Sequence, residues 1–479
     1  MRSLNFKKTF IVVAVLLALS TFNQAQDIKV QDTKAQASER NIRAHLDFLA
    51  SDAMQGRGSM TQFEWLAGQY IASQLQQYGI EPAGQTDAAG KTTYIQSANL
   101  NRTTFVELPK LSYTSKGAAK TFEHGKEMLI LRGMTLAQIA GELQKITLDD
   151  KPRAGAIAFI KLRAGENTEQ VNSKLPALLT SGAAAVIIEE TTRWRQQWDA
   201  TASRGLTSVT FADKPPAAGT VLITVSKEAA NLLAEAADGT PVEVKGKQAT
   251  EALKTWNVVG KLVGSDAKLS PEVILLSAHM DHLGVRPNTP GEDKIFNGAD
   301  DDASGCVAVL ELARILGSGP PPKRSVYFAF FGTEEIGGFG AQHFVNNLPF
   351  AKDKFIANLE FEMIGRPDNI VAADQLWLTG YDRSNLGPEL AKRGAKIVND
   401  PHPEQNFFQR SDNYTLARQG IIAHTVSSYG LHTDYHKPSD EVKTINFEHM
   451  TRAISSMVEP VLWLVNSDFK PAWNEGKKP

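Results

Sequence analysis

The chain has 479 residues, a formal net charge of −2 at pH 7 and 42% apolar residues. This length allows two to three domains, and the apolar fraction is ordinary for a globular protein. The near-neutral charge provides no broad basic surface, so we expect no nucleic-acid partner. The one cysteine, Cys306, cannot form an intrachain disulfide, and we interpret it as a small buried core residue.

Residues 1–25 have the pattern of a secretory signal peptide. Three cations, Arg2, Lys7 and Lys8, precede a short apolar run, and the small residue Ala25 follows that run. The run is too short to span a membrane comfortably. We therefore expect cleavage near Ala25, export to a periplasmic or extracellular location, and no membrane segment afterwards. A single cysteine suits such a compartment, where disulfides are permitted but not required.

Residues 26–110 begin with two helical patterns. Apolar residues recur at helical spacing over about 42–49 and again over 63–75, and Gly56-Arg57-Gly58 separates the two patterns. The stretch 85–110 is polar, and we expect a loop with an edge strand there.

Residues 111–250 read as a separate α/β module. Short apolar strands and helical segments alternate in it; the expected strands are 156–160, 184–188 and 219–225, and the expected helices are 171–179 and 227–237. Its one histidine is His124, and its acids are scattered. A binding or shielding role is therefore our default for this region.

Residues 251–479 alternate strands and helices. We expect strands at 257–262, 273–276, 325–331, 355–363, 376–379 and 421–426, and helices at 303–316, 339–345, 385–392 and 447–465. The run SVYFAFF at 325–331 is apolar throughout, which is typical of a strand covered on both faces. The pattern predicts an α/β fold with a doubly wound, mixed but mostly parallel sheet and helices on both faces.

The stretch 275–305 carries an unusual set of polar residues. His279, Asp281 and His282 end an apolar strand, and three aspartates, residues 300–302, precede a helix. Helix capping explains Asp302 and its neighbour Asp301, but it does not explain a histidine at the strand end. Ligands bind at the carboxyl edge of such sheets.

Further acids and histidines follow the later strands: Glu334, Glu335, Glu362 and His436. A lone histidine is more often a hydrogen-bonded structural residue, and paired glutamates usually form a solvated surface. Glu334 and Glu335, however, directly follow the buried run 325–331, where solvated charge is least expected. Imidazole and carboxylate are the ligands of zinc sites, and a two-metal site needs a bridging carboxylate. The pattern therefore predicts a metal site.

These motifs resemble the zinc-dependent aminopeptidase family, whose relatives include glutamate carboxypeptidase, glutaminyl cyclase and the transferrin receptor. The motifs that carry the resemblance are SAHMDH, NGADDDASG, FGTEEIGGFG, FEMIGR, QRSDNY and LHTDYHKPSDE, together with HLDFLASDAMQGRG and IASQLQQYGIEPAG near the start. The middle region resembles a protease-associated domain. The resemblance implies a catalytic domain in two parts, 26–110 and 251–479, with an inserted domain at 111–250.

The resemblance also implies two zinc ions per chain, and a role for each matched residue. The implied metal ligands are His279, Asp300, Glu335, Glu362 and His436. Asp300 would bridge both ions, and a cis peptide would join it to Asp301. Asp281 would orient His279, and Glu334 would act as general base and then acid. The implied reaction is hydrolysis of the N-terminal bond of peptides or proteins.

Two positions depart from the family pattern. Glu362 stands where the family usually has Asp, and Glu360 is a rival ligand on the same strand. Asn413 stands where many relatives have His. We expect His282 and His432 to be structural or to face the substrate, while Tyr435 is a candidate for contact with the reaction intermediate.

Three other functions stay open at this point. A single-zinc cyclase of the glutaminyl type would need fewer ligands, and a receptor-like binding protein would need no base. A carboxypeptidase or dipeptidase would need an arginine for the substrate carboxylate, for which Arg366 and Arg410 are the candidates. The sequence leaves the N-terminal residue preference and the oligomeric state open.

Overall fold

A computed structural model describes residues 36–203, 205–214 and 219–479. The expected signal peptide, residues 1–25, lies outside the described residues. Within the described ranges, no helix has both the length and the apolar content that crossing a membrane requires.

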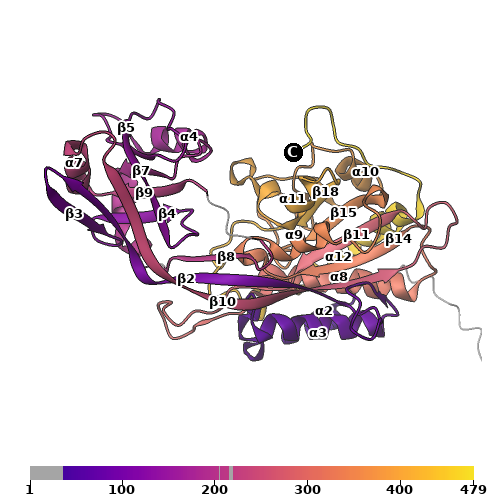
Figure 1. Ribbon diagram of the computed structural model, residues 1–479. Helices are drawn as coiled ribbons and strands as arrows, with labels where there is room; N and C mark the ends of the chain where they lie inside the picture. Colours follow the sequence, from indigo (N-terminus) through magenta and orange to yellow (C-terminus); the bar gives the residue numbers. More distant parts are fainter. Residues whose placement is uncertain (1–35, 204, 215–218) are drawn as a thin grey trace, which may run out of the picture.

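A mixed sheet forms the centre of the larger part of the molecule (Figure 1). Its strands lie in the order β17 (Ile397–Asn399), β16 (Leu376–Leu378), β18 (Ala423–Ser427), β15 (Phe355–Phe361), β11 (Val273–His279), β14 (Ser325–Phe331) and β10 (Pro241–Leu262). β11 pairs in parallel with both β14 and β15, and β15 pairs in parallel with β18. β10 is antiparallel to β14, and β16 is antiparallel to β18. The predicted mixed, mostly parallel sheet is confirmed.

Helices cover both faces of this sheet. One face packs against α2 (Glu39–Leu49), α3 (Gln62–Gln77), α8 (Gly305–Ser318) and α12 (Phe447–Asn466), and the other against α9 (Phe339–Asn346) and α11 (Asp412–Ala417). α10 (Leu386–Lys392) also packs on the first face. Successive side chains of a strand point to opposite faces, so Phe328 and Phe330 join the first core while Ala329 and Phe331 join the second. Every residue of β14 is buried, as the apolar run predicted.

Two long strands connect this part to the inserted part (Figure 1). β2 (Ile95–Ser115) and β10 pair antiparallel along most of their length. We predicted only a loop and an edge strand in 85–110, because the middle of this ribbon is polar and lacks a buried face that would impose alternation. The expected domain boundaries at 110/111 and 250/251 fall inside these two strands, so the division into domains stays a prediction.

The inserted part has its own core, and its strands continue the central sheet through the pairing of β5 with β10. Its strands lie in the order β5 (Gln138–Ile146), β6 (Ile157–Ile160), β7 (Ala185–Glu189), β9 (Val221–Val225) and β4 (Met128–Arg132). α7 (Lys227–Glu235) packs on one face and α4 (Thr168–Leu179) on the other. β3 (Ala118–Glu123) and β8 (Thr207–Phe211) pair with β2, and the short helices α5 (Thr192–Gln196) and α6 (Trp198–Ala202) complete the region. Its likeness to a protease-associated domain remains a prediction.

Candidate metal centre

Three chain segments meet at one edge of the central sheet. β11 ends at His279, β14 leads into Glu334 and Glu335, and β15 leads into Glu362. These three strands run parallel as immediate neighbours, so their carboxyl ends lie at the same edge. The sheet topology therefore gathers the polar groups that the sequence analysis singled out.

Asp301 occupies the centre of this group. Its Oδ1 lies 3.2 Å from Nε2 of His279, and its Oδ2 lies 3.2 Å from Nε2 of His436. The cis peptide bond joins Asp301 to Asp302. The prediction that gave Asp300 the central position, with a cis bond to Asp301, is wrong by one residue.

Asp300 has a different environment. Its Oδ1 accepts a hydrogen bond from the backbone N of Gly365 at 2.7 Å, and its Oδ2 pairs with Nε2 of His432 at 2.9 Å. Nε of Arg366 lies 3.9 Å from the same Oδ2. Asp300 thus ties the segment after β15 to the loop that carries His432 and His436. Three identical residues in a row gave the sequence analysis no local signal with which to distinguish them.

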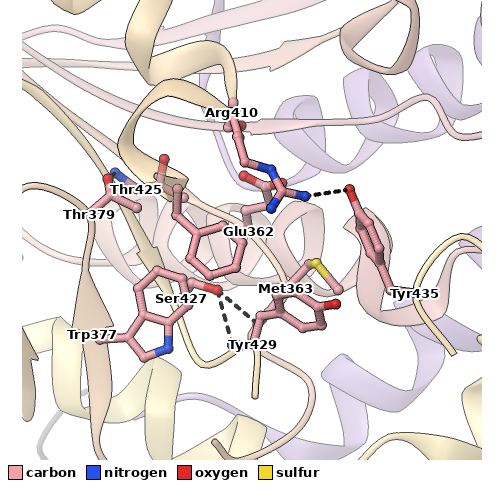
Figure 2. Close-up of a pocket in the computed structure, with 11 residues that line it drawn as sticks. Glu362, Met363, Trp377, Thr379, Arg410, Thr425, Ser427, Tyr429 and Tyr435 are labelled. Atoms are coloured by element: carbon pink, nitrogen blue, oxygen red, sulfur yellow. Dashed lines mark hydrogen bonds between the residues drawn. The ribbon is translucent and has the colours of Figure 1, made fainter. Parts of the chain in front are cut away.

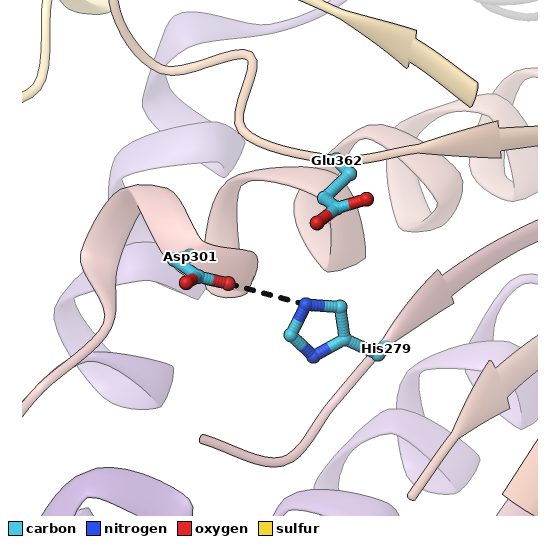
Figure 3. A group of neighbouring side chains, drawn as sticks. All are labelled: His279, Asp301 and Glu362. Carbon is cyan, nitrogen blue, oxygen red and sulfur yellow. Dashed lines mark ion pairs between the residues drawn. The ribbon is translucent and has the colours of Figure 1, made fainter. Parts of the chain in front are cut away.

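The first candidate metal position consists of His279, Asp301 and Glu362, whose ligand atoms all lie within 4.8 Å of one another (Figure 3). Nδ1 of His279 donates to the backbone O of Asp281 at 3.1 Å, which leaves Nε2 facing the two carboxylates. The rival Glu360 lies elsewhere: it accepts hydrogen bonds from the backbone N of Asn413 at 2.6 Å and from two hydroxyl groups.

The second candidate position shares Asp301. His282, Asp301 and Glu335 form a group with ligand atoms within the same 4.8 Å limit. Nε2 of His436 lies 3.2 Å from Oε2 of Glu335, as well as 3.2 Å from Asp301. The structure therefore brings Glu335 and His436 together as expected, and adds His282, which we had not counted among the ligands.

The donor set of both positions fits zinc. Several buried atoms of the group have no hydrogen-bond partner in the described structure; they are Nε2 of His279, Nδ1 of His282, Oδ2 of Asp301 and Oε1 of Glu335. Unsatisfied buried polar atoms are costly, so their convergence favours a group that can bind a cation. Tetrahedral zinc with bonds of about 2.0–2.1 Å separates its ligand atoms by about 3.3 Å. The separations of 3.2 Å around Asp301 agree with that geometry.

Asp281 connects His279 to the glutamate pair. Its Oδ1 accepts from the backbone N of Glu334 at 3.0 Å, and its Oδ2 accepts from Oγ of Ser59 at 2.5 Å. Its carboxylate is 3.8 Å from Nδ1 of His279, farther than its backbone O. Asp281 thus orients His279 through its carbonyl group, and holds the backbone of Glu334 through its carboxylate.

The buried acids have strongly shifted pKa values. Burial raises the pKa of Glu362 to about 8, although the nearby His279 acts to lower it. Burial likewise raises the pKa of Glu334 well above the ordinary glutamate value, against the opposing effect of His279. Burial and Asp301 also act to raise the pKa of Glu335, but His282 and His436 outweigh them and its pKa falls to about 2. The site therefore gathers more buried negative charge than its histidines balance, which favours a bound cation.

Arg57 is a residue of this centre that the sequence analysis missed. It is fully buried and donates to four backbone oxygens, those of Leu49, Met280, Asn297 and Gly298, at 2.6–3.0 Å. It thereby ties the end of β11 to the loop before the three aspartates. The motif Gly56-Arg57-Gly58 was the available signal, but we treated it only as a break between helices.

Asp440 is a second missed residue. Its carboxylate accepts from the backbone N of Asp300 and of Asp301 at 3.1 Å, and it pairs with Arg366 at 2.8 Å. It holds the backbone of the aspartate run from the side opposite Arg57. Asp440 lies in the motif LHTDYHKPSDE between β18 and α12, but we had assigned it no role.

A pocket lies beside Glu362 (Figure 2). Aromatic and apolar side chains line much of it, namely Met363, Trp377, Phe407, Tyr429 and Tyr435, and the remaining lining residues are Glu362, Thr379, Arg410, Ser411, Thr425 and Ser427. The guanidinium of Arg410 lies 4.9 Å from the ring centre of Phe407 and approaches Tyr435. The pocket therefore offers an apolar interior next to the first metal position.

The fold and this centre define an α/β protein with two candidate metal positions at the carboxyl edge of a mixed sheet. Residues 257–460 match the model of Peptidase family M28, so this part of the chain is similar to that family. The predicted resemblance to zinc aminopeptidases is confirmed by this match.

Among characterised relatives, the chain is 27% identical over 304 residues to the probable lipoprotein aminopeptidase LpqL of Mycobacterium tuberculosis, covering 60% of this chain and 56% of that protein. It is 26% identical over 238 residues to the aminopeptidase YwaD of Bacillus subtilis, covering 47% of this chain and 49% of that protein. The chain thus spans about half the length of the curated relatives it matches. The solved aminopeptidase from Aneurinibacillus sp. strain AM-1 aligns over 90% of this chain and 95% of its own, with a TM-score of 0.55 and 19% identity. At 19% identity, the similarity to this solved structure shows a shared fold.

Proposed function

We propose that this protein is a two-zinc aminopeptidase that hydrolyses the N-terminal bond of peptides. The observation that carries the proposal is the placement of Asp301, whose two carboxylate oxygens each lie 3.2 Å from a different histidine. A separate glutamate completes each side, Glu362 beside His279 and Glu335 beside His436. Such a shared carboxylate is what a pair of metal ions requires.

His279, Asp301 and Glu362 would hold one ion, and Asp301, Glu335 and His436 the other. Bound zinc lowers the pKa of a water molecule and polarises a carbonyl group. The chain supplies the geometry: Asp281 fixes His279, while Arg57 and Asp440 fix the backbone around Asp301.

Glu334 would move the proton. It directly precedes the ligand Glu335, and its backbone is held by Asp281 at 3.0 Å. It belongs to neither group of metal-capable residues, so its carboxylate is free to accept a proton. We propose that Glu334 takes a proton from the attacking water and delivers it to the leaving amine.

The pocket beside Glu362 would receive the side chain of the first residue. Its apolar walls, including Trp377 and Phe407, favour apolar or aromatic side chains over charged ones. Removing such a side chain from water is favourable in proportion to its apolar area.

A second candidate function is a dipeptidase or carboxypeptidase, and Arg410 is the observation that favours it. Arg410 lines the pocket, and it has no ion-pair partner among the described residues. Arg366 is not available for a substrate, because it pairs with Asp434 at 2.7 Å and with Asp440 at 2.8 Å. The paired metal positions favour the two-ion enzyme over a single-zinc cyclase, and the presence of Glu334 favours an enzyme over a binding protein.

We also propose export, on the basis of the signal-peptide pattern in residues 1–25, and a binding or shielding role for the protease-associated-like part.

A substrate panel tests the proposal and separates the candidates. The purified protein is given aminoacyl reporter amides, the same amides with an acetylated amine, and free dipeptides, before and after chelation. An aminopeptidase cleaves the first set, spares the acetylated set and loses activity on chelation. Cleavage restricted to substrates with a free carboxylate, abolished in Arg410→Gln, would support the dipeptidase instead. Chelator-resistant activity would contradict both.

A further inference from the structure

We propose that His282 is a further ligand of the second metal position, bound through Nδ1. The inference rests on the proposed two-zinc function. It concerns a residue that we had expected to be structural or to face the substrate. The second position would then hold two imidazoles, from His282 and His436, whereas the first holds only that of His279.

The contact between His282 and Glu335 carries this inference. Nδ1 of His282 lies 2.6 Å from Oε1 of Glu335 and 3.9 Å from Oδ2 of Asp301. His282 is fully buried. Its ligand atom also falls within the 4.8 Å group formed with Asp301 and Glu335.

This close contact is poorly aligned for a hydrogen bond. Both Nδ1 of His282 and Oε1 of Glu335 lack a hydrogen-bond partner in the described structure, although they are only 2.6 Å apart. A hydrogen bond requires the donor hydrogen to point at the acceptor, and its strength falls steeply when the angle is poor. Two buried polar atoms that adjoin without pointing at each other are both available to a common ion, and binding would move them from 2.6 Å toward the roughly 3.3 Å that separates two ligands of tetrahedral zinc.

The backbone around His282 holds the imidazole in this place. Its N donates to the backbone O of Arg57 at 3.1 Å, and its O accepts from the backbone N of Ser59 at 3.3 Å. Gly298 leaves room for the ring: a Cβ at that position would lie 2.6 Å from Cδ2 of His282. The absence of a side chain at residue 298 therefore lets the imidazole reach the metal position.

The two positions would differ in affinity as a result. Zinc favours imidazole nitrogen more than magnesium, calcium or manganese do, so a second nitrogen raises both affinity and selectivity. The other ring nitrogen, Nε2, has no acceptor in the described structure. An imidazole without such a partner is a less basic ligand than one that has it, as His279 has in the backbone O of Asp281. We therefore expect His282 to strengthen the second position without being essential to it.

Proton NMR of the cobalt-loaded protein tests the inference. Each imidazole bound to cobalt gives one strongly shifted exchangeable N–H signal from its remote nitrogen. The proposal predicts three such signals in the wild-type protein, from His279, His282 and His436. It predicts that His282→Gln lacks one of them, and that the affinity for the second ion falls by about 10-fold or more in competition titrations.

His432→Gln is the matched control. His432 belongs to the same loop as His436, but its Nε2 contacts Asp300 rather than a candidate ligand group. This variant retains all three signals. Retention of all three in His282→Gln as well, or an affinity for the second ion that is unchanged, overturns the inference. If His282→Gln does not fold, the wild-type spectrum carries the test, because two signals with two bound ions also overturn it. A wild-type protein that binds no cobalt would instead contradict the proposed function itself.

Discussion

Asp300 and Asp301 are neighbours in the chain, yet their carboxylates serve different parts of the structure. Asp301 lies between His279 and His436, at 3.2 Å from each, whereas Asp300 accepts from the backbone N of Gly365 and pairs with His432. The two residues have the same chemistry and nearly the same burial. Position alone therefore places Asp301 in the candidate metal centre and Asp300 against the loop around it.

Substituting each aspartate by asparagine separates these roles. Asp301→Asn removes the charge that both metal positions share, so we expect loss of both zinc ions and of activity. Asp300→Asn leaves both positions intact, so we expect near-normal zinc content and a lower stability of the loop that carries His436. Zinc per chain, measured by atomic emission after dialysis, distinguishes the two variants. Equal zinc loss in both would contradict the assignment.

Glu334→Gln tests the proton transfer. The amide keeps the size of the side chain but cannot accept the proton, and Glu334 belongs to neither metal group. We expect kcat to fall by about 10²- to 10⁴-fold with zinc content unchanged. Steady-state kinetics and metal analysis on one preparation provide the check, with Glu335→Gln as the comparison that should lose zinc. Residual activity near the wild-type level would show that Glu334 is not the base.

Arg57→Met tests the support behind the centre. The variant removes the donor to four backbone oxygens of the buried loop and strand end. Unsatisfied buried acceptors are costly, and we expect the free energy of unfolding of the metal-free protein to fall by about 3 kcal/mol. Urea unfolding measures this change. Arg43→Met is the control, because Arg43 is half-exposed, pairs with Glu39 on the same helix and lies over the ring of Phe447; its effect should stay below about 2 kcal/mol. Similar effects for the two variants would contradict the role of Arg57.

His424 should make stability depend on pH, far from the chemistry. Burial lowers its pKa from 6.5 to about 4, although its bond to the backbone O of Thr379 acts the other way. Between those two pH values the unfolded chain binds a proton that the folded chain does not. The contribution of neutral His424 to the free energy of unfolding is therefore complete above pH 6.5. It is lost as the pH falls to 4, by roughly 3 kcal/mol in all.

The variant His424→Asn isolates this effect. Asparagine does not titrate in this range, so the difference in unfolding free energy between wild type and variant should shrink as the pH falls from 6.5 to 4. Urea unfolding at several pH values gives that difference. A difference that is constant with pH would show that His424 does not titrate as described.

Much of the catalytic fold was predictable because its strands are buried on both faces. The apolar run 325–331 predicted β14 with its bounds unchanged, and the helical spacing over 63–75 predicted α3 within two residues at each end. The long ribbon of β2 and β10 was not predictable in the same way. Its middle is exposed, and it is stabilised by pairing between residues far apart in the sequence, which leaves no local pattern.

The site residues also divide into those that a local sequence pattern predicted and those that it did not. Strand ends identified His279, Glu335 and Glu362 as candidates, because charge directly after a buried strand is informative. The choice among three adjacent aspartates, and the inclusion of His282, depended on the course of an irregular loop. Arg57 was missed because its partners are backbone oxygens, so its motif Gly56-Arg57-Gly58 indicated only a break between helices.

Anomalous diffraction at the zinc edge from crystals of the zinc-loaded protein tests the central claim most directly. The account predicts two anomalous peaks per chain, with the carboxylate of Asp301 between them, one peak beside His279 and Glu362 and the other beside Glu335 and His436. A single peak, or two peaks with Asp300 between them, would contradict it.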